Sequence, residues 1–571
     1  MKNTPWQRFK KIVAAAEPSY ALFALAMLFL VITETFPFLY PLLLKNILDA
    51  LNQGINLKSY AVIYAIILIV HTLLLYGKTF FGVLISANAT YTLRKKLIYH
   101  INSISLLDVR KYSTGNWISR LSADMDVLGV MFRDGILELV SNALLLAFSI
   151  AFMFWQEPRL AIFTMIFFPA MMLITVYFRR RLKHQQIKYR QRLSSLTGFI
   201  QELLPAIPLM QVFGKQAFLT EKFASEQKSY QKAGINWSKS FAAFFPLIQS
   251  FSDLSLIACY AGGLWWISQG SISVGSLVAF VWVASIYTRP LRDLSNRINQ
   301  VQTSLVAGDR VLDALETGKV EYRGRNKLDP QPHSPAVRFR GVSFAYHAQQ
   351  PVLDSVSFSV PANSFCALAG RSGQGKSTIL HLLSRLYAPQ TGEIEIFGQN
   401  IAEIEAAELK SCSAYISQDP FLFAGSVKEN ILLGAEFCPE LFEQALERAR
   451  ISEMLDKLPQ GIDTQIGAQG IEVSRGQRQL IACARAFYRN PQILLLDEPV
   501  ASVDSQTEHL LQAAVADLLE NRTALVVSHR VSTLTKADIV VFLDSQKRVF
   551  TASHAELAQN NAEYAQMFAK S

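Results

Sequence analysis

Long apolar runs dominate the first half of the chain, whereas the second half alternates short apolar runs with polar stretches. A helix needs roughly 20 mostly apolar residues to cross a bilayer. Runs of about this length occupy residues 20–44, 60–84, 135–155, 160–177, 244–266 and 272–287. The first run is too long for the core of a signal peptide, so we expect it to remain in the protein. The pattern predicts an α-helical polytopic membrane domain with six transmembrane helices.

Basic residues indicate which ends of these helices face the cytoplasm. The connections 46–59, 156–159 and 268–271 are short and poor in Lys and Arg, whereas the segments near 86–133 and 178–242 are long and charged. Cytoplasmic loops carry the excess of Lys and Arg in membrane proteins. We therefore expect both long segments and both termini in the cytoplasm, in a multi-pass protein of a cell inner (plasma) membrane.

The long cytoplasmic segments have a second expected role. A helix that continues some 25 residues beyond the membrane extends roughly 37 Å, which is far enough to reach a cytoplasmic domain. Residues 114–121 open with turn chemistry before a short helical pattern, and residues 201–213 contain two prolines. We expect these two stretches to contact the second half of the chain.

The formal net charge of +10 does not indicate a nucleic-acid partner. Many basic residues stand in clusters beside apolar runs, such as 94–96 and 179–181, which is typical of a membrane protein. Apolar residues at helical spacing near the N-terminus, with Lys and Arg between them, predict a helix in the membrane interface over residues 1–18. The expected partners are therefore a lipid bilayer and a small-molecule substrate, with no nucleic acid.

Five ionisable residues fall inside the apolar runs: Glu34, His71, Lys78, Glu138 and Asp253. Charges at that depth are costly and usually face the interior of a helix bundle or a wet cavity. They are candidates for a translocation pathway, and pairs satisfied within the bundle are the alternative. Glu34 and Asp253 suggest tolerance for a cationic cargo.

Residues 370–378 match G-x-x-x-x-G-K-[ST], the phosphate-binding loop. A strand-like run over 365–369 precedes the loop, and a helical pattern over 376–387 follows it. Glycines let backbone N–H groups turn toward phosphates, and the helix N-terminus adds its positive end. The residues expected to bind ATP here are Gly370, Arg371, Ser372, Gly373, Gln374, Gly375, Lys376, Ser377 and Thr378.

Three residues are candidate ligands of Mg²⁺. Asp497 ends the apolar run 493–496, as expected for a buried parallel strand that delivers a carboxylate at its C-terminal end. The Ser377 hydroxyl is the second candidate, and the neutral side-chain oxygen of Gln418 is the third. The five cysteines show no C-x-x-C pair and no His cluster with metal spacing, so we expect no metal other than Mg²⁺.

Further residues complete a candidate site for ATP hydrolysis. Glu498 would polarise the water that attacks the γ-phosphate, because a carboxylate can orient water while it accepts a developing proton. Gln418 could also touch this water, and His529 could donate to the γ-phosphate. The ring of Tyr346, ahead of the phosphate loop, could stack on adenine. The pattern predicts an ATPase with Glu498, His529 and Gln418 as catalytic residues.

Composition changes again over residues 306–335, where polar residues and prolines indicate a linker. Beyond it, β-branched runs alternate with helical stretches, which predicts an α/β P-loop NTPase domain. The expected organisation is an interfacial elbow helix at 1–18, a transmembrane domain with two long cytoplasmic loops at 19–305, the linker, and the ATP-binding domain at 336–571.

These motifs resemble the ATP-binding cassette (ABC) superfamily, and six spans followed by one cassette resemble an exporter-type (type IV) half-transporter. The resemblance covers essentially the whole chain. It implies a dimer in which two cassettes close head to tail over two ATP molecules, each held between one chain's phosphate loop and the other's signature sequence. Closure would switch the membrane halves from inward- to outward-facing, and hydrolysis would reset them.

The implied function is ATP-driven export of hydrophobic or amphipathic compounds, of the multidrug type. A siderophore importer, a peptide exporter and a lipid flippase share this fold and remain alternatives. A soluble cassette ATPase that acts on DNA or ribosomes is disfavoured by the six spans. A catalytically idle partner is disfavoured by the intact Glu498 and His529.

The signature departs from the family pattern L-S-G-G-Q. Residues 473–477 read Val-Ser-Arg-Gly-Gln, so Ser474, Gly476 and Gln477 remain as expected ATP contacts and Arg475 replaces a glycine. Arg475 restricts the backbone and would add bulk near the partner's γ-phosphate. Complete Walker motifs with an altered signature resemble one member of a heterodimeric multidrug-type pair. A heterodimer is therefore favoured, and a homodimer that tolerates Arg475 is the alternative.

Overall fold

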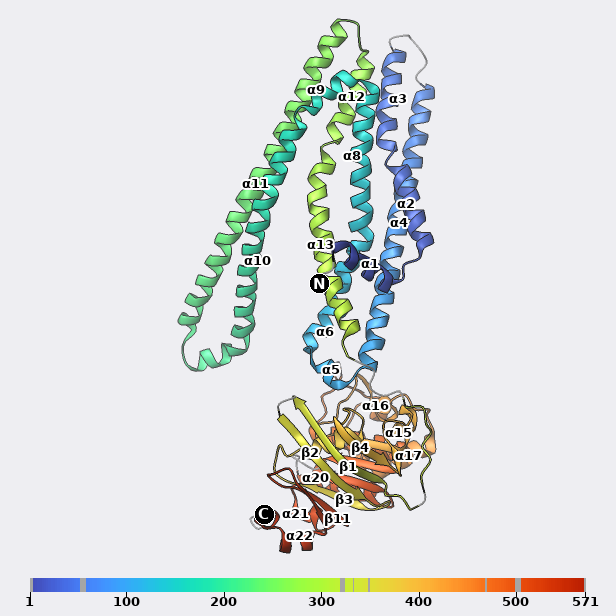
Figure 1. Cartoon of the computed structure of the whole chain (residues 1–571), viewed down its shortest axis with the longest axis vertical. Helices are drawn as coiled ribbons and strands as arrows, with labels where there is room; N and C mark the ends of the chain where they lie inside the picture. Colours follow the sequence, from blue (N-terminus) through green and yellow to red (C-terminus); the bar gives the residue numbers. More distant parts are fainter. Residues whose placement is uncertain are drawn as a thin grey trace. The chain divides into compact units, whose positions relative to one another are not determined.

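The computed structural model describes residues 4–51, 58–318, 324–331, 333–347, 350–467, 470–498 and 505–568. The chain separates into two compact units, whose elements are labelled in Figure 1. The membrane unit comprises Met1–His100 and Ser113–Glu316, and the cassette unit comprises Ile101–Tyr112 and Thr317–Ser571. Each unit has hydrophobic clusters of its own.

Helices alone make up the described part of the membrane unit. They are α1 (Pro5–Ala16), α2 (Tyr20–Thr33), α3 (Phe36–Leu51), α4 (Lys58–Ser103), α6 (Thr114–Leu121), α7 (Ala123–Val130), the π-helical turn η1 (Met131–Gly135), α8 (Ile136–Gln156), α9 (Pro158–Met165), α10 (Phe168–Val212), α11 (Gln216–Ser268), α12 (Val274–Ile286) and α13 (Arg289–Glu316).

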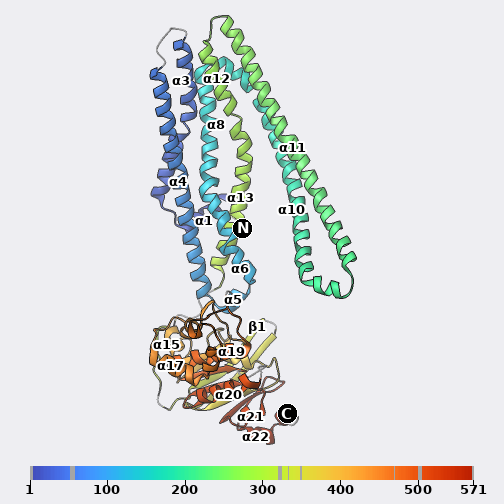
Figure 2. The same cartoon turned by 180° about the vertical axis from the view of Figure 1, so that it is seen from behind.

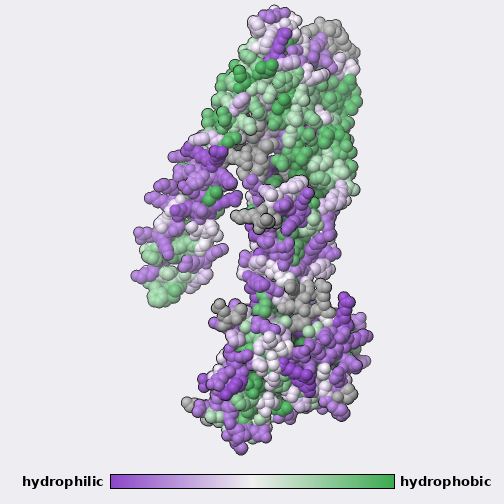
Figure 3. All heavy atoms as spheres, viewed as in Figure 1, coloured by the Kyte–Doolittle hydropathy of each residue, from purple (hydrophilic) through white to green (hydrophobic). Residues whose placement is uncertain are grey.

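Five of the six predicted spans lie in stretches that are long and apolar enough to cross a membrane. These stretches are Tyr20–Asp49, Lys58–Ser103, Thr114–Gln156, Pro158–Val212 and Gln216–Ser268. The sixth predicted span coincides with α12, an apolar helix of only 13 residues. Hydrophobic residues cover the upper part of the membrane unit in Figure 3, as lipid contact requires.

The first span is interrupted between α2 and α3. Pro37 has no N–H to donate to the carbonyl of Thr33, four residues earlier, which weakens the helix at this point. α2 ends at Thr33, and the N–H of the C-cap residue Glu34 donates to the Leu30 carbonyl at 3.0 Å. The break leaves Glu34 buried, with 7% of its surface exposed.

α10 and α11 form a long helical hairpin that diverges from the other membrane helices in both views (Figures 1 and 2). Pro205 and Pro208 lie near the end of α10. The tip of the hairpin exposes apolar side chains, with Leu209 at 55%, Val212 at 83% and Phe213 at 66% exposure. Such a contiguous apolar surface outside the lipid-covered region is typical of a contact with another protein surface.

The cassette unit is an α/β domain, as predicted. Its helices are α5 (Leu106–Arg110), α14 (Lys376–Leu383), α15 (Ala406–Cys412), α16 (Val427–Leu432), α17 (Pro439–Arg448), α18 (Ser452–Asp456), η2 (Gly461–Asp463), α19 (Arg475–Arg489), α20 (Ser505–Leu519), α21 (Val531–Leu534), α22 (His554–Asn560) and α23 (Ala562–Phe568). Its strands are β1 (Val337–His347), β2 (Gln350–Val360), β3 (Phe365–Ala369), β4 (Thr391–Ile396), β5 (Gln399–Asn400), β6 (Ser413–Ile416), β7 (Gly425–Ser426), β8 (Gln465–Ile466), β9 (Ile493–Asp497), β10 (Thr523–Val527), β11 (Ile539–Leu543) and β12 (Val549–Ala552).

The central sheet of this unit has the strand order β12-β11-β3-β10-β9-β6. Strands β11, β3, β10, β9 and β6 are parallel, and β12 is antiparallel to β11. Because β3, β9, β10 and β11 are buried on both faces, they are continuous apolar runs rather than alternating ones. The carboxyl ends of β3, β9 and β10 therefore meet at one edge, which is where parallel sheets place their ligand sites.

Three boundaries differ from the sequence-based expectation. α13 continues to Glu316, into the segment expected to be a linker from residue 306, because its apolar positions keep helical spacing and Val311 and Ala314 are buried. α14 ends at Leu383 rather than near 387. Residues 114–121, expected to contact the second half of the chain, form α6 inside the membrane unit. The segment Ile101–Tyr112 belongs to the cassette unit instead, where Leu106 and Leu107 pack against the hydrophobic core.

Candidate nucleotide site and membrane charge network

The phosphate loop, residues 370–375, connects β3 to α14 as predicted. Gly370, Gly373 and Gly375 have φ angles of 149°, 83° and 98°, a region that favours glycine. A Cβ on Gly375 would also lie 2.8 Å from the Leu353 Cδ2 atom. The glycines thus allow a backbone path that no other residue could follow without strain.

The Lys376 side chain folds back over this loop. Its Nζ donates to the carbonyl oxygens of Gly370 and Arg371, both at 2.8 Å, and the residue is 6% exposed. Burial lowers the pKa of Lys376, whereas the nearby Glu498 and Asp497 raise it. The hydrogen bonds that this ammonium makes within the described residues go to neutral carbonyls, so its positive charge is available to a phosphate.

Two of the three predicted Mg²⁺ ligands lie together. Ser377 Oγ donates to Asp497 Oδ1 at 3.0 Å, and the Tyr415 hydroxyl donates to Oδ2 of the same carboxylate at 3.4 Å. Burial and then Asp497 raise the pKa of Tyr415, so its phenol stays a neutral donor. A hydroxyl and a carboxylate are the hard oxygen ligands that Mg²⁺ prefers. The third candidate, Gln418, points its amide nitrogen at Glu498 instead.

The three residues predicted to be catalytic meet at the end of β9. Glu498 has a φ angle of +46°, which is uncommon for a residue with a side chain, and its N–H donates to the Val527 carbonyl at 3.2 Å. Its Oε2 accepts from Gln418 Nε2 at 2.9 Å, and its Oε1 lies 3.1 Å from His529 Nε2. The backbone turn therefore directs the Glu498 carboxylate between Gln418 and His529.

The charge state of His529 follows from its surroundings. Burial lowers the pKa of His529 below the ordinary 6.5, Lys376 lowers it further, and Glu498 opposes both. The imidazole is therefore neutral at pH 7, with one nitrogen as donor and the other as acceptor. A neutral His529 that donates through Nε2 to Glu498 could redirect that donor to a phosphate oxygen.

Tyr346, predicted to stack on adenine, lies beside the first turns of α14. Its hydroxyl is 3.1 Å from Thr378 Oγ1 and 3.3 Å from His381 Nδ1. The edge of its ring contacts Tyr387, with 5.2 Å between ring centroids. These contacts hold the aromatic ring next to the phosphate loop, as an adenine contact requires.

The signature residues start α19. Ser474 is the N-cap: its Oγ accepts from the Gln477 N–H at 3.2 Å, and Gln477 Oε1 accepts from the Ser474 N–H at 2.8 Å. Gly476 is buried in the first turn. This capping box fixes the start of the helix. Among the described residues, Ser474 and Gln477 bond to each other, and neither bonds to the phosphate loop of the same chain.

Arg475 turns toward its own chain. Its Nη2 donates to the Gln418 carbonyl at 3.2 Å, and Gln479 Nε2 donates to the same oxygen at 3.1 Å. The altered signature residue thus contacts the backbone of the residue whose side chain binds Glu498. Sequence alone gave no signal for this contact, because 57 residues separate the two partners.

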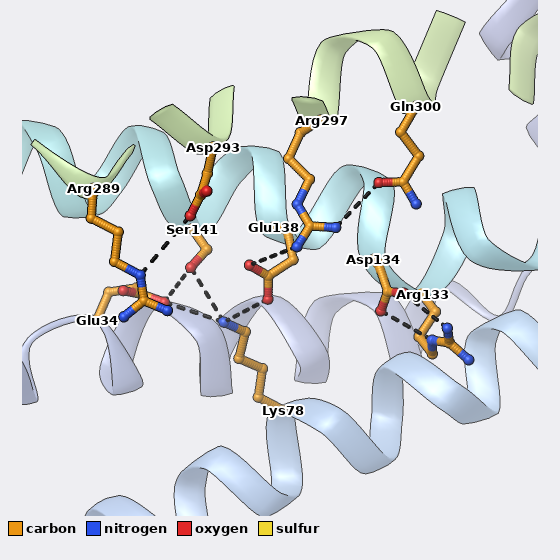
Figure 4. A network of polar contacts seen from close by, with 10 residues as sticks. All are labelled: Glu34, Lys78, Arg133, Asp134, Glu138, Ser141, Arg289, Asp293, Arg297 and Gln300. Carbon is orange, nitrogen blue, oxygen red and sulfur yellow. Dashed lines mark hydrogen bonds and ion pairs between the residues drawn. The ribbon is translucent and has the colours of Figure 1, made fainter. Parts of the chain in front are cut away.

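A network of charged side chains lies within the membrane unit (Figure 4). Lys78 Nζ, from α4, is 3.2 Å from Glu34 Oε1, 3.2 Å from Ser141 Oγ and 3.6 Å from Glu138 Oε1. Ser141 Oγ also donates to Glu34 Oε1. Arg297, from α13, approaches Glu138 Oε2 at 4.0 Å. The Glu34 charge is therefore compensated by Lys78, so the expectation that Glu34 favours a cationic cargo loses its basis.

The other ionisable residues of the apolar runs lie elsewhere. His71 Nδ1 is 2.8 Å from the Tyr40 hydroxyl, and its ring stacks on Phe36. Asp253 accepts from Gln249 Nε2 at 2.8 Å on the surface of α11. Sequence analysis did not single out Ser141 and Arg297. Ser141 follows Glu138 by three residues, so the two side chains lie on one face of the helix. A hydroxyl one helical turn from a predicted intramembrane charge is thus the pattern that points to Ser141.

A helical membrane unit and an α/β unit with a phosphate loop, paired carboxylates and a neutral histidine define a membrane-embedded nucleoside triphosphatase. Residues 23–291 match the family described as ABC transporter transmembrane region, and residues 353–501 match the family described as ABC transporter. The chain therefore belongs to the ABC transporters, and its ATP-binding domain is an ATPase coupled to transport.

Known proteins share this organisation. The Bacillus subtilis protein YgaD, provisionally named a multidrug export ATP-binding/permease protein, is 28% identical over 94% of this chain and 95% of its own length. The ATP-dependent lipid A-core flippase of Pseudomonas aeruginosa is 28% identical over 98% of this chain and 95% of its own. A solved structure of a bacterial Atm1-family ABC exporter with ATP bound is 25% identical, with a TM-score of 0.75 over 96% of this chain and 98% of that one. The chain has the fold of an ABC exporter.

Proposed function

We propose that the chain exports hydrophobic or amphipathic compounds, driven by ATP hydrolysis at the site around Glu498. The observation that carries the proposal is the position of this carboxylate. It follows a buried strand, is held by Gln418 and His529, and directly adjoins the Ser377–Asp497 pair. Its surroundings fit a residue that orients an attacking water.

Each polar residue has a proposed role in the reaction. Lys376 and the N–H groups of residues 370–377 bind the β- and γ-phosphates. Ser377 and Asp497 would hold Mg²⁺, which would neutralise charge on the phosphate oxygens. Glu498 accepts the proton of the water, and His529 donates to the γ-phosphate. Gln418, now on Glu498, would turn toward the metal or the water.

Two further surfaces support a dimer of half-transporters. The cassette unit has a groove of about 790 Å³ lined by Arg385, Leu409, Phe421 and Arg485, among others, and Phe421 is 71% exposed. The hairpin tip around residues 209–213 exposes apolar side chains. In a dimer, the tip of one chain would cover the groove of the other, which removes both apolar surfaces from water.

The altered signature favours a heterodimer over a homodimer. The Arg475 side chain, which the family glycine lacks, donates to the Gln418 carbonyl of its own chain. An ATP bound against this signature would meet a bulkier and more constrained surface than L-S-G-G-Q offers. The partner chain would then supply the better signature to the competent site of this chain.

Affinity purification of the membrane-solubilised chain, with mass spectrometry of stoichiometric partners, tests the dimer. We expect a second half-transporter with an intact L-S-G-G-Q. Recovery of this chain alone as a dimer would establish the homodimer. In that case Arg475→Gly should raise its ATPase rate, because the substitution restores the family residue at both sites.

Transport measurements separate the candidate cargoes. Uptake of amphipathic dyes into inside-out vesicles is expected for the multidrug type. The similarity to a lipid A-core flippase makes lipid transfer the second candidate. A lipid flippase would instead move a labelled phospholipid or lipid A between leaflets. Siderophore import would accumulate the ferric complex on the opposite side, and peptide export would respond to peptides alone.

A further inference from the structure

The two carboxylates of the membrane charge network are held differently. Glu34 accepts hydrogen bonds from Ser141 and Lys78, and 9% of its side chain is exposed. Among the described residues, Glu138 has the cations Lys78 and Arg297 as partners, at 3.6 and 4.0 Å, and 36% of its side chain is exposed. Within the described residues no hydrogen bond to the Glu138 carboxylate is found. Glu138 is therefore the loosely held and accessible end of the network.

Charge balance in the network depends on α13. Glu34, Lys78 and Glu138 include two carboxylates and one ammonium, which leaves a net charge of −1. Arg297 completes the balance from α13, and its contact with Glu138 is the longest of the network. A carboxylate that lacks its full counter-charge is costly where water is scarce, so the loss of Arg297 favours another cation beside Glu138.

Arg297 has a second partner to which it can withdraw. Its Nη1 donates to Gln300 Oε1 at 3.2 Å on the same helix, as Figure 4 shows. Lys78 has no such freedom, because Glu34 and Ser141 hold its ammonium and only 10% of its side chain is exposed. Arg297 is thus the exchangeable cation beside Glu138, and Lys78 is the fixed one.

The network lies near the cytoplasmic boundary of the membrane. α8 rises about 27 Å between Glu138 and Gln156, at 1.5 Å per residue. That length is close to the roughly 30 Å thickness of the hydrocarbon core. With the outer end of α8 at the far surface, Glu138 lies where a cargo from the cytoplasm or the inner leaflet would enter.

We infer that Glu138 is a cation-binding subsite of the transport pathway and that Arg297 is its internal occupant, which a cationic cargo displaces. The inference rests on the proposed export function and names its substrate class. The cargo is an amphipathic organic cation, whose charged group takes the place of the guanidinium and whose apolar body lies among the membrane helices. Displacement replaces one cation beside Glu138 by another, and the displaced guanidinium keeps its hydrogen bond to Gln300.

Equilibrium binding to the full-length chain in lipid nanodiscs tests this inference. Tritiated tetraphenylphosphonium is the cationic probe, and triphenylphosphine oxide is a neutral probe of similar shape. Glu138→Gln should raise the Kd of the cation about tenfold, a change that corresponds to about 1.4 kcal/mol. Arg297→Gln should lower it severalfold, because the competing cation is gone. Arg297→Lys should behave like the wild type, and the neutral probe should bind all variants alike.

Asp309 offers a matched control. It pairs with Arg8 at 2.9 Å, and both side chains are 31% exposed, so Asp309→Asn also breaks a half-exposed ion pair of this unit. This variant should leave tetraphenylphosphonium binding unchanged. Poor folding would weaken binding, so it cannot explain tighter binding by Arg297→Gln. The Arg297→Gln measurement therefore tests the inference even if Glu138→Gln folds badly.

Two results would overturn the inference. One is weaker or unchanged cation binding in Arg297→Gln. The other is an equal loss of cationic and neutral probes in Glu138→Gln, which would make the network a purely structural element. Probe binding does not require ATP turnover. A lack of ATP-dependent uptake of any probe would contradict the export proposal. Only the binding measurements bear on the subsite, so the two failures can be told apart.

Discussion

The nucleotide site and the membrane charge network solve the same problem in different ways. Both must hold charged side chains close together until a ligand arrives. In the nucleotide site the backbone does this, through positive φ angles at Gly373, Gly375 and Glu498 and through strand ends. In the membrane network, side chains from separate helices neutralise one another, with Lys78 between Glu34 and Glu138.

The difference determines what a sequence can reveal. Loop geometry is local, so the glycines and Lys376 appear as one contiguous motif, and Asp497 and Glu498 end one apolar run. The membrane pairs join positions as far apart as Lys78 and Ser141, whose proximity depends on helix packing. Isolated intramembrane charges were therefore visible in the sequence, but their pairing was not.

The largest expected effect concerns the nucleotide site. Glu498→Gln keeps the shape of the side chain and removes the base, so the ATPase rate should fall about 10²–10⁴-fold while ATP still binds. Phosphate release by the reconstituted protein and nucleotide binding by fluorescence measure the two effects. A variant that retains near-normal turnover would show that another residue is the base. Glu508→Gln, a partly exposed carboxylate paired with Arg530, is the control.

The next effect concerns the membrane network, where charges are mutually dependent. Glu34→Gln leaves Glu138, at 3.6 Å, as the carboxylate partner of the buried Lys78, which should lower the free energy of unfolding by about 3 kcal/mol. Thermal unfolding in detergent should show a lower Tm for Glu34→Gln and partial recovery for Glu34→Gln combined with Lys78→Gln. Additive losses in the double variant would contradict an ion pair.

A smaller effect on ATP affinity is expected for the phosphate-loop glycines, which allow a positive φ angle and, at Gly375, a close approach of another side chain. Gly373→Ala introduces only the strain of a positive φ, since a Cβ there meets no atom within 4 Å. Gly375→Ala adds a clash with Leu353 to similar strain. Each strained residue costs about 1–3 kcal/mol, so ATP affinity should fall in both and further in Gly375→Ala. Equal losses would show that the contact with Leu353 relaxes.

The smallest expected effect is on pH dependence. Burial and Lys376 lower the pKa of His529, so this residue stays neutral as the pH falls from 7.5 to 6.5 and gains its proton only at lower pH. The ratio of the wild-type ATPase rate to that of His529→Gln should therefore be nearly constant over this range. A ratio that falls steeply around pH 6.5 would contradict the lowered pKa.

Sequence reasoning predicted most of the fold but missed features that depend on tertiary contacts. The apolar periods gave the spans and the central strands, and the motif gave the loop between β3 and α14. The assignment of the segment before α6 to the cassette unit depends on how Leu106 and Leu107 pack, which no local pattern encodes. The contact of Arg475 with Gln418 likewise exists only after folding brings α19 to the end of β6.

We expect the nucleotide site to power transport and the membrane network to select the cargo. Uptake of tetraphenylphosphonium and of a neutral dye into inside-out vesicles can be compared for wild type, Glu498→Gln and Glu138→Gln in the presence of ATP and Mg²⁺. Glu498→Gln should stop uptake of both compounds, and Glu138→Gln should lower uptake of the cation alone. Persistent uptake in Glu498→Gln, or equal losses of both compounds in Glu138→Gln, would contradict this expectation.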